Sequence, residues 1–339
     1  MAFNPVQAAE ALTRGARSEF LNTYRKSYAG VLASLAPVMD LAVASDKSSE
    51  IYVYPESAPY PRRRPQGQSI QSKNFRYRSY TITNVDWSSS VEWDRGQVVY
   101  DQTGSIISQA RQAGANFATL PERVFFQLMT STTDSALLAS ASPNAPDGAG
   151  LYSSTDGASA NRFGVSGGNL VTGTGVTLAS TIRADVFNAI ERFLGFQDTE
   201  GQPFLDPGML DSGFKMFFNY TNLQVVNEAL VQKNTQIITQ NVAASENVAT
   251  TAVSNIVLDS GFRIQLVPTQ RITDNDMFLF ANAAWVKPIV EQVATPLEEM
   301  PFNVGNSDQA RDYQIEGIRY IARRGYGLNL PFGTVKINN

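Results

Sequence analysis

The order of apolar and polar positions divides the chain into segments with different expected structures. Near the start, apolar residues recur at helical spacing, which predicts a helical N-terminal arm over residues 1–45. The residues that set this spacing are Val6, Ala9, Leu12 and Ala16. Two later runs, 51–54 and 75–85, are rich in tyrosine and β-branched residues, which favour strands. Together they predict one long β-hairpin.

The segment between these two runs combines prolines with a basic cluster. Prolines at 55, 59, 61 and 65 exclude a helix or a central strand, because proline fixes φ and lacks a backbone N–H. Arg62, Arg63 and Arg64 lie among them. A two-stranded hairpin alone is marginal in water, so we expect it to lie against another surface.

We interpret Arg62, Arg63 and Arg64 as a candidate intersubunit contact. A guanidinium group pairs bidentately with a carboxylate, which suits an anchor on a neighbouring subunit. A nucleic-acid contact, a polyproline-type ligand and a solvated loop tip stay open as alternatives.

The clearest helix is predicted over 99–117, where apolar residues alternate in steps of three and four. Pro121 suits the first turn of a second helix. Residues 140–178 are rich in Gly, Ser and Ala, which predicts a loop at a boundary between modules.

The remainder of the chain mixes helices with strands, which predicts an α+β fold class. A helix is expected from Ser180 or Thr181 to Gly195, and Thr221 with Gln224 predicts a capping box at the start of another. The expected strands are 215–218, 256–258, 262–267, 277–281, 285–292 and 313–322.

Composition limits the chemistry that the chain can perform. The sequence has no Cys and no His, which excludes disulfides, thiolate nucleophiles and imidazole sites. Any chemistry would have to use carboxylates, Lys, Tyr or the backbone. We predict no catalytic residue, no cofactor and no metal site. The net charge of −4 provides no overall basic field for nucleic acid. The apolar stretch 28–44 resembles a signal peptide, but Pro37 and Asp40 interrupt it, and it is short for a membrane span.

One duplicated motif suggests catalysis. Leu-Asp-Ser-Gly-Phe occurs twice, with the aspartates at Asp211 and Asp259, and Asp-Ser/Thr-Gly is the signature of aspartic proteases. The two copies are too close in the sequence for each to centre a protease lobe. We expect each Asp-Ser-Gly to form a tight turn that leads into a strand.

The order of elements, from arm through hairpin, long helix and loop to a mixed domain, resembles the Hong Kong 97 coat fold of tailed phages. Within that fold the chain is most similar to the Mu-like major head subunit family. The stretches that carry the resemblance are Tyr80-Thr-Ile-Thr-Asn, Val91-Glu-Trp-Asp-Arg95, Pro121-Glu122, Gly195-Phe-Gln-Asp-Thr-Glu-Gly201, Lys287-Pro-Ile-Val-Glu-Gln292 and Ile318-Arg319-Tyr320.

The resemblance implies a division of the chain into domains. The implied parts are an N-terminal arm (1–45), an extended hairpin loop (46–86), a peripheral domain with the spine helix (87–150 and 300–339), a linker (151–174) and an axial domain (175–299).

The resemblance also implies a function. It implies a major capsid protein whose copies form hexamers and pentamers and close an icosahedral shell around phage double-stranded DNA. Its implied partners are other copies of itself, portal, scaffold and decoration proteins, with weak contact to packaged DNA and none to a membrane. Its implied location is the virion, after assembly in the host cytoplasm. Another phage structural protein, an encapsulin-type shell and an aspartic-type hydrolase stay open as alternatives.

Overall fold

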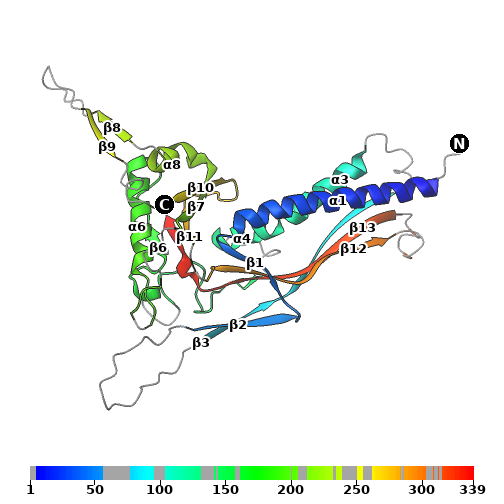
Figure 1. Cartoon of the computed structure of the whole chain (residues 1–339), viewed down its shortest axis with the longest axis horizontal. Helices are drawn as coiled ribbons and strands as arrows, with labels where there is room; N and C mark the ends of the chain where they lie inside the picture. Colours follow the sequence, from blue (N-terminus) through cyan, green and yellow to red (C-terminus); the bar gives the residue numbers. More distant parts are fainter. Residues whose placement is uncertain are drawn as a thin grey trace, which may run out of the picture. The chain divides into compact units, whose positions relative to one another are not determined.

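The chain is described by a computed structural model and forms two compact units. The described residues are 5–55, 77–94, 104–130, 141–142, 144–156, 161–199, 201–204, 212–231, 234–238, 250–254, 262–282, 284, 286–302, 308, 312 and 315–339. The first unit comprises Met1–Ile51, Thr81–Ser142 and Ile289–Gly327, and the second comprises Tyr52–Tyr80, Pro143–Pro288 and Leu328–Asn339. Both units contain helices and strands (Figure 1), which confirms the predicted α+β class.

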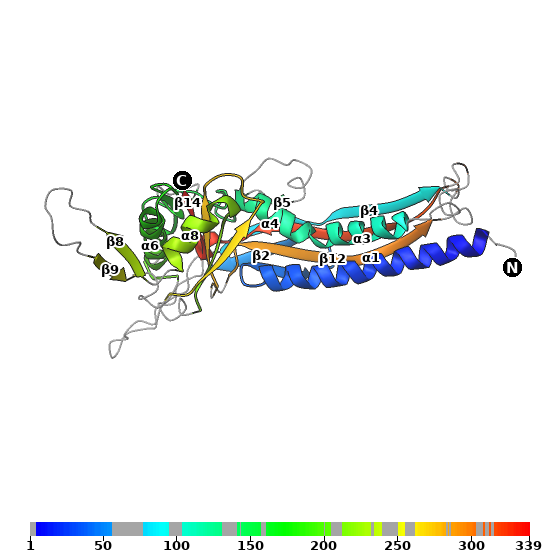
Figure 2. The same ribbon diagram turned by 90° about the horizontal axis from the view of Figure 1, so that it is seen from above.

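The first unit is a sheet with helices along one face. The strand order is β1 (Met39–Ala44), β12 (Ile289–Phe302), β13 (Ile315–Leu328) and β4 (Val85–Asp94), with β5 (Ala141–Ser142) beside β13. β1 is parallel to β12, and β13 is antiparallel to β4. The helices are α1 (Pro5–Leu35), α3 (Ser105–Ala118) and α4 (Leu120–Thr130). In Figure 2, α1 and α3 run side by side along the long strands.

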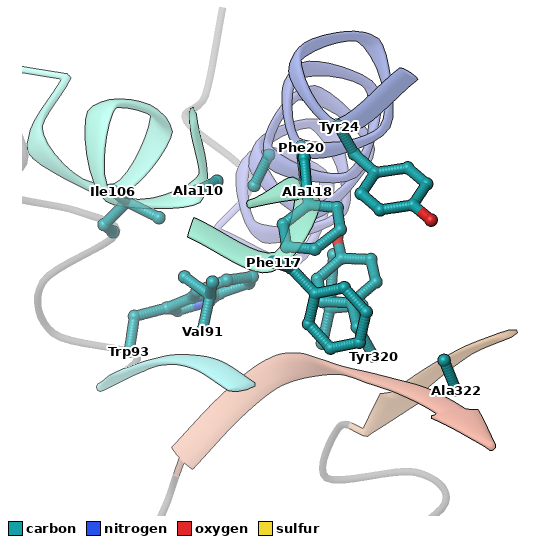
Figure 3. Close-up of a cluster of buried hydrophobic side chains, with 12 residues drawn as sticks. Phe20, Tyr24, Val91, Trp93, Ile106, Ala110, Phe117, Ala118, Tyr320 and Ala322 are labelled. Carbon is teal, nitrogen blue, oxygen red and sulfur yellow. The ribbon is translucent and has the colours of Figure 1, made fainter. Parts of the chain in front are cut away.

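The core of the first unit lies where α1 and α3 meet β4 and β13. Alternate residues of the two strands point toward the helices, as the period of two in a strand requires. Figure 3 shows Phe20 of α1, Phe117 of α3 and Tyr320 of β13 gathered between these elements. The Phe20 and Tyr320 rings stack with their centroids 3.4 Å apart. The buried cluster contains Ala16, Phe20, Tyr24, Val91, Trp93, Ile106, Ala110, Phe117, Ala118, Ile318, Tyr320 and Ala322.

The predicted N-terminal arm is a helix followed by a strand, and both pack within the first unit. α1 ends at Leu35 because Pro37 cannot continue a helix. β1 then begins at Met39 and has a register shift near Ala42, whose φ is 55°. The helical spacing is confirmed, whereas the strand is a correction. The sequence did not predict it because the partner of β1, β12, comes from the far end of the chain.

Gly114 allows a close approach of α1 to α3. A Cβ atom at Gly114 would lie 2.5 Å from the backbone oxygen of Phe20, whereas a Cβ atom at Gly30 on α1 would meet nothing within 4 Å. We expect Gly30→Ala to raise the free energy of unfolding by about 1 kcal/mol, because alanine has the higher helix propensity. Gly114→Ala is expected to lower it by about 1–3 kcal/mol, because overpacking outweighs that gain. Urea unfolding measures both, and a stabilised Gly114→Ala would contradict the close packing.

The second unit contains a five-stranded sheet. Its order is β10 (Ile264–Thr269), β7 (Phe214–Asn219), β11 (Met277–Ala281), β14 (Thr334–Asn338) and β6 (Leu170–Thr172). Every residue of β7 and β11 is buried, so both faces of these central strands are covered. Helix α6 (Ala179–Gly195) packs on β6, β14 and α8 (Leu223–Leu230). The strands β8 (Asn234–Ile238) and β9 (Thr250–Ser254) form a separate antiparallel pair.

The predicted hairpin strands are present. β2 (Ser49–Pro55) and β3 (Tyr77–Thr83) form a two-stranded sheet. The segment between them, with the prolines and the basic cluster, lies outside the described residues.

Three elements predicted for the second half of the chain differ from the structure or lie outside the described residues. The capping box of Thr221 and Gln224 is wrong, because the 3-10 helix η2 (Tyr220–Asn222) precedes α8 and Asn219 Oδ1 accepts the bond from the Thr221 N–H. The strand expected over 285–292 begins only at Ile289, after Pro288, and continues to Phe302. The strand expected over 256–258 lies outside the described residues.

The two compact units divide the chain differently from the implied domains. All of β12 pairs within the sheet of the first unit, although 289–299 were assigned to the axial domain. Leu328–Asn339 belong to the second unit, because β14 pairs with β11 and β6 there. The assignment of these units as peripheral and axial stays a prediction.

Candidate assembly sites

The predicted site residues Arg62, Arg63 and Arg64 lie outside the described residues, so their role as an intersubunit contact stays a prediction. The described stem of the hairpin carries a different feature, two exposed apolar side chains. Ile51 and Val53 on β2 are 68% and 58% exposed. They share one face of the strand, because side chains alternate along it. Tyr52 faces the other way and stacks on Tyr80 of β3 at 5.2 Å. Single exposed apolar side chains are normal on protein surfaces, so it is their place side by side on one face of a two-stranded stem that makes them candidates for a contact.

A buried ionic cluster fastens α1 to the sheet of the first unit. Arg324 on β13 donates to Glu291 Oε1 on β12 at 2.8 Å and to the Tyr24 hydroxyl of α1 at 2.7 Å. Tyr326 donates to the same Glu291 oxygen at 3.0 Å. The Arg324 guanidinium also lies 5.0 Å from the centroid of the Tyr28 ring. Because α1, β12 and β13 each contribute a group, the cluster joins the N-terminal helix to two consecutive strands near the other end of the chain.

The surroundings of Arg324 in this cluster favour the charged form of its guanidinium group. Arg324 is 2% exposed and Glu291 is fully buried. Burial disfavours the charged guanidinium, but Glu291 and the neighbouring tyrosines outweigh this and raise the pKa of Arg324. Burial, followed by the Glu291 charge, raises the pKa of Tyr28 to about 12. At neutral pH Arg324 is therefore charged and Tyr28 is neutral.

A second buried ion pair organises the loop segment of the second unit. Arg162 donates to Asp147 through Nε at 2.7 Å and through Nη2 at 2.9 Å, which is a bidentate pair. Its Nη1 donates to the carbonyl oxygens of Gly150 and Leu151 at 2.8 and 3.0 Å. Arg162 is fully buried. The segment 151–174, predicted as a linker, is therefore ordered around a guanidinium in its described part.

A cavity of about 320 Å³ lies beside this pair, within the second unit. The Phe163 and Phe204 rings form aromatic walls and meet edge to face at 5.7 Å. Arg78 Nη2, from β3, is 3.8 Å from Asp156 Oδ2. The lining residues are Arg78, Asp147, Asp156, Asn161, Phe163, Gly164, Gln197, Asp198, Thr199, Phe204 and Leu330. Sequence reasoning missed this cavity, because its walls come from four segments with no shared motif.

The described part of the first Asp-Ser-Gly copy, Ser212 and Gly213, leads into a strand, as predicted. Gly213 has a φ of 82°, and a Cβ atom there would lie 2.4 Å from the Arg263 carbonyl oxygen. β7 begins at the next residue and pairs in parallel with β10, which follows the second copy. Both aspartates, Asp211 and Asp259, lie outside the described residues.

We expect Asp211→Asn and Asp259→Asn to leave assembly intact, measured by sedimentation. Loss of a proteolytic maturation step in either variant would support the hydrolase alternative.

The turn Asp274-Asn275-Asp276 forms a hydrogen bond with Asn339. Asp276 Oδ1 accepts from the backbone N–H of Asn339 at 3.0 Å, and Asp274 Oδ1 accepts from the Asp276 N–H at 3.3 Å. Partial removal of solvent and then the Asp276 charge raise the pKa of Asp274 above its usual 3.8.

The raised pKa of Asp274 predicts a pH dependence of stability. For an acid with a raised folded-state pKa, the favourable contribution is full below the unfolded pKa and is lost as pH rises through the folded pKa. At pH 7 the charged Asp274 therefore opposes folding, and Asp274→Asn, which keeps the acceptor oxygen, is expected to be more stable than wild type. The advantage is expected to shrink as pH falls toward 4. Thermal unfolding across this range tests the sign, and an advantage that grows on acidification would contradict it.

Among the described residues, no group of three or more acidic side chains could hold a metal ion. No helix in the described part of the chain is long and apolar enough to cross a membrane.

Comparison with solved structures identifies the fold. The capsid of cyanophage P-SCSP1u superimposes with a TM-score of 0.54 at 11% identity, over 88% of this chain and 86% of that chain. The mature capsid of bacteriophage PhiM1 gives a TM-score of 0.54 at 12% identity, over 89% and 85%. The capsid of a native GTA particle gives 0.54 at 8% identity, over 91% and 90%. The chain has the fold of tailed-phage capsid proteins, which confirms the predicted Hong Kong 97-type fold.

A match to a protein family adds sequence evidence to the likeness in fold. Residues 10–137 match the family described as Mu-like prophage major head subunit gpT. This match confirms the resemblance to the Mu-like major head subunits. No curated protein sequence matches the chain.

Proposed function

We propose that the chain is a major head subunit and that its copies assemble into the icosahedral shell of a tailed phage, around double-stranded DNA. The observation that carries the proposal is the combination of a capsid fold over nearly the whole chain with a major head subunit match over 10–137. The proposed role is structural, because the protein acts by forming the shell.

The surfaces of the two units support this function. Ile51 and Val53 present an exposed apolar face on a two-stranded stem, a surface whose burial against another copy would be favourable. The interior of each unit is well ordered by the Arg324–Glu291 and Arg162–Asp147 pairs. The subunit therefore has a buried ion pair in each unit and an exposed hairpin stem that could contact another copy.

The proposed partners follow from a closed shell. Copies form hexamers and pentamers, a portal replaces one pentamer, and scaffold and decoration proteins act during and after assembly. The net charge of −4 gives weak contact with packaged DNA, because an acidic protein does not hold polyanions. Assembly takes place in the host cytoplasm, and the finished protein resides in the virion.

Electron microscopy and sedimentation of the purified chain test the proposal. The expected result is closed particles of uniform size, with pentamers or hexamers at low concentration. A chain that stays monomeric at every salt and protein concentration, both alone and when co-expressed with the other head proteins, would contradict it.

A further inference from the structure

We infer that a group of buried residues at the base of the β2–β3 hairpin holds this base on the sheet of the first unit and so positions the hairpin for contact with a second copy. The inference rests on the proposed function, because it concerns how the exposed stem is presented to another subunit. All of these residues belong to the first unit. The hairpin-base cluster consists of Ser45, Ile82, Asn84, Gln292, Gly325 and Gly327.

Two glycines of β13 make room for an isoleucine at the end of β3. The preceding residue, Arg324, reaches Tyr24 of α1, so Gly325 and Gly327 face the opposite side of the sheet, because side chains alternate along a strand. A Cβ atom at Gly327 would lie 2.5 Å from Cγ1 and Cδ1 of Ile82, and one at Gly325 would lie 2.9 Å from its Cγ2. Ile82 is fully buried. Its side chain therefore packs directly on the backbone of β13, an approach that only glycine allows.

Asn84 supplies the polar part of the cluster, and both amide hydrogens and the amide oxygen of its side chain are used. The side-chain nitrogen donates to Ser45 Oγ at 2.9 Å and to the Lys47 carbonyl oxygen at 2.7 Å, in the connection between β1 and β2. The side-chain oxygen accepts from Gln292 Nε2 at 2.9 Å. The backbone N–H donates to the Ser48 carbonyl oxygen at 2.8 Å. Asn84 thus joins the segment before β2 to the segment after β3.

Gln292 connects this network to β12, which lies between β1 and β13 in the sheet. Its Nε2 also donates to the Ile82 carbonyl oxygen at 3.0 Å. A Cβ atom at Gly325 would lie 2.7 Å from this nitrogen, so the same glycine gives space to the apolar and the polar part of the cluster. Both Gln292 and Asn84 are buried. A displaced hairpin base would leave their amide groups without partners, which is unfavourable away from water.

The cluster therefore holds both strands of the hairpin where they leave the sheet. A two-stranded hairpin is marginal on its own, and the stem carries the exposed apolar face of Ile51 and Val53. A fixed base limits the positions that this face can take before a second copy binds, so less entropy is lost on contact. Ile82 and Asn84 are positioning residues for assembly in this sense. A disturbed cluster is expected to weaken assembly more than it weakens the fold.

Spin labels on the unassembled subunit test whether the cluster holds the hairpin base. The natural sequence has no Cys, so Ile51→Cys and Ser88→Cys place one nitroxide on β2 and one on β4, both at exposed positions of the first unit. The distance distribution is expected to be narrow in the otherwise unchanged chain and broader or shifted with Asn84→Ala or Gly327→Ala added. Gly114→Ala, between α1 and α3, is the control and is expected to leave the distribution unchanged. No change with Asn84→Ala and Gly327→Ala would overturn the inference.

Gly327→Ala tests the role in assembly, because its methyl group would overlap Ile82. The concentration needed for shell formation is expected to rise about tenfold or more. Gly114→Ala is again the matched control, since its Cβ atom would lie equally close, at 2.5 Å, to the backbone oxygen of Phe20. It is expected to lower resistance to urea without raising the assembly concentration. Asn84→Ala adds no overlap and is expected to impair assembly in the same direction, so it decides the question if Gly327→Ala does not fold.

A compensating substitution tests the packing of Ile82 on Gly327. Ile82→Ala removes the atoms that meet the new methyl group and leaves its Cβ atom 3.6 Å away, an ordinary contact. The double variant is expected to assemble at a lower concentration than Gly327→Ala alone, because the two changes act on the same contact. A double variant that assembles no better than Gly327→Ala would overturn the packing role of Ile82.

The outcomes separate this inference from the proposed function. Equal effects of Gly327→Ala and Gly114→Ala on assembly, at an equal loss of resistance to urea, would overturn the positioning role. A changed label distribution with unchanged assembly would overturn it as well. Failure of the unmodified chain to form shells would count against the proposed function, whereas the spin labels would still show whether the cluster holds the hairpin base.

Discussion

Replacement of Arg324 by Met is expected to lower the free energy of unfolding by about 3–5 kcal/mol, because Glu291 would remain buried without its counter-charge. The variant also removes the bond from Arg324 to the Tyr24 hydroxyl, which ties α1 to the sheet. Urea unfolding of the unassembled chain measures the loss. The expected loss of unfolding free energy exceeds that of a substitution on the surface, because both charged side chains lie in the interior of the first unit.

A neighbouring ion pair provides the matched control. Arg319 lies on the same strand as Arg324 but is 46% exposed, and its nearest contact with Glu92 is 3.8 Å. Arg319→Met is therefore expected to cost at most about 1 kcal/mol. The double variant Arg324→Met with Glu291→Met is expected to recover much of the loss, since no uncompensated charge remains. If Arg324→Met were as mild as Arg319→Met, the buried cluster would not hold α1 on the sheet.

Replacement of Val53 by Lys is expected to raise the concentration required for shell assembly by at least about tenfold, while the subunit stays folded. The side chain is 58% exposed, so the substitution disturbs little within the subunit. An interface formed on this face would instead have to bury an unpaired ammonium group, at a cost of several kcal/mol. Light scattering during assembly measures the effect, and circular dichroism confirms the fold.

The control for this variant is another valine of almost equal exposure. Val231, at the end of α8, is 57% exposed. Val231→Lys adds the same charge, so an equal loss of assembly in the two variants would show that charge alone is responsible. A selective loss with Val53→Lys would place the exposed face of the hairpin stem in a contact between subunits.

Much of the fold follows from local patterns in the sequence. The alternation of tyrosine and β-branched residues identifies β2 and β3, and helical spacing identifies α1, α3, α4 and α6. Pro37 lies just after the end of α1, because a proline restricts the residue before it to an extended conformation. The capping box at Thr221 failed because a 3-10 turn precedes α8, and the preference of a single side chain does not decide between the two.

The candidate sites depend more strongly on distant contacts. Arg324 and Glu291 stand on separate strands, and their pairing with Tyr24 brings the beginning and the end of the chain together. Arg162 occurs in a stretch rich in Gly and Ser that is typical of a flexible linker, so its burial carried no sequence signal. Arg62, Arg63 and Arg64 stand out in the sequence alone, and their role as an intersubunit contact stays a prediction.

The sequence by itself determined many of the helices and strands, the absence of thiol and imidazole side chains, and the resemblance to a phage head subunit. These conclusions depend on the spacing and identity of residues within short stretches, where backbone geometry acts directly. The tertiary structure decided that β1 joins β12, that Arg324 and Arg162 are buried with their carboxylates, and that Phe163 and Asp198 line one cavity. Each of these depends on residues from separate segments of the chain, whose approach is set by the packing of the whole unit.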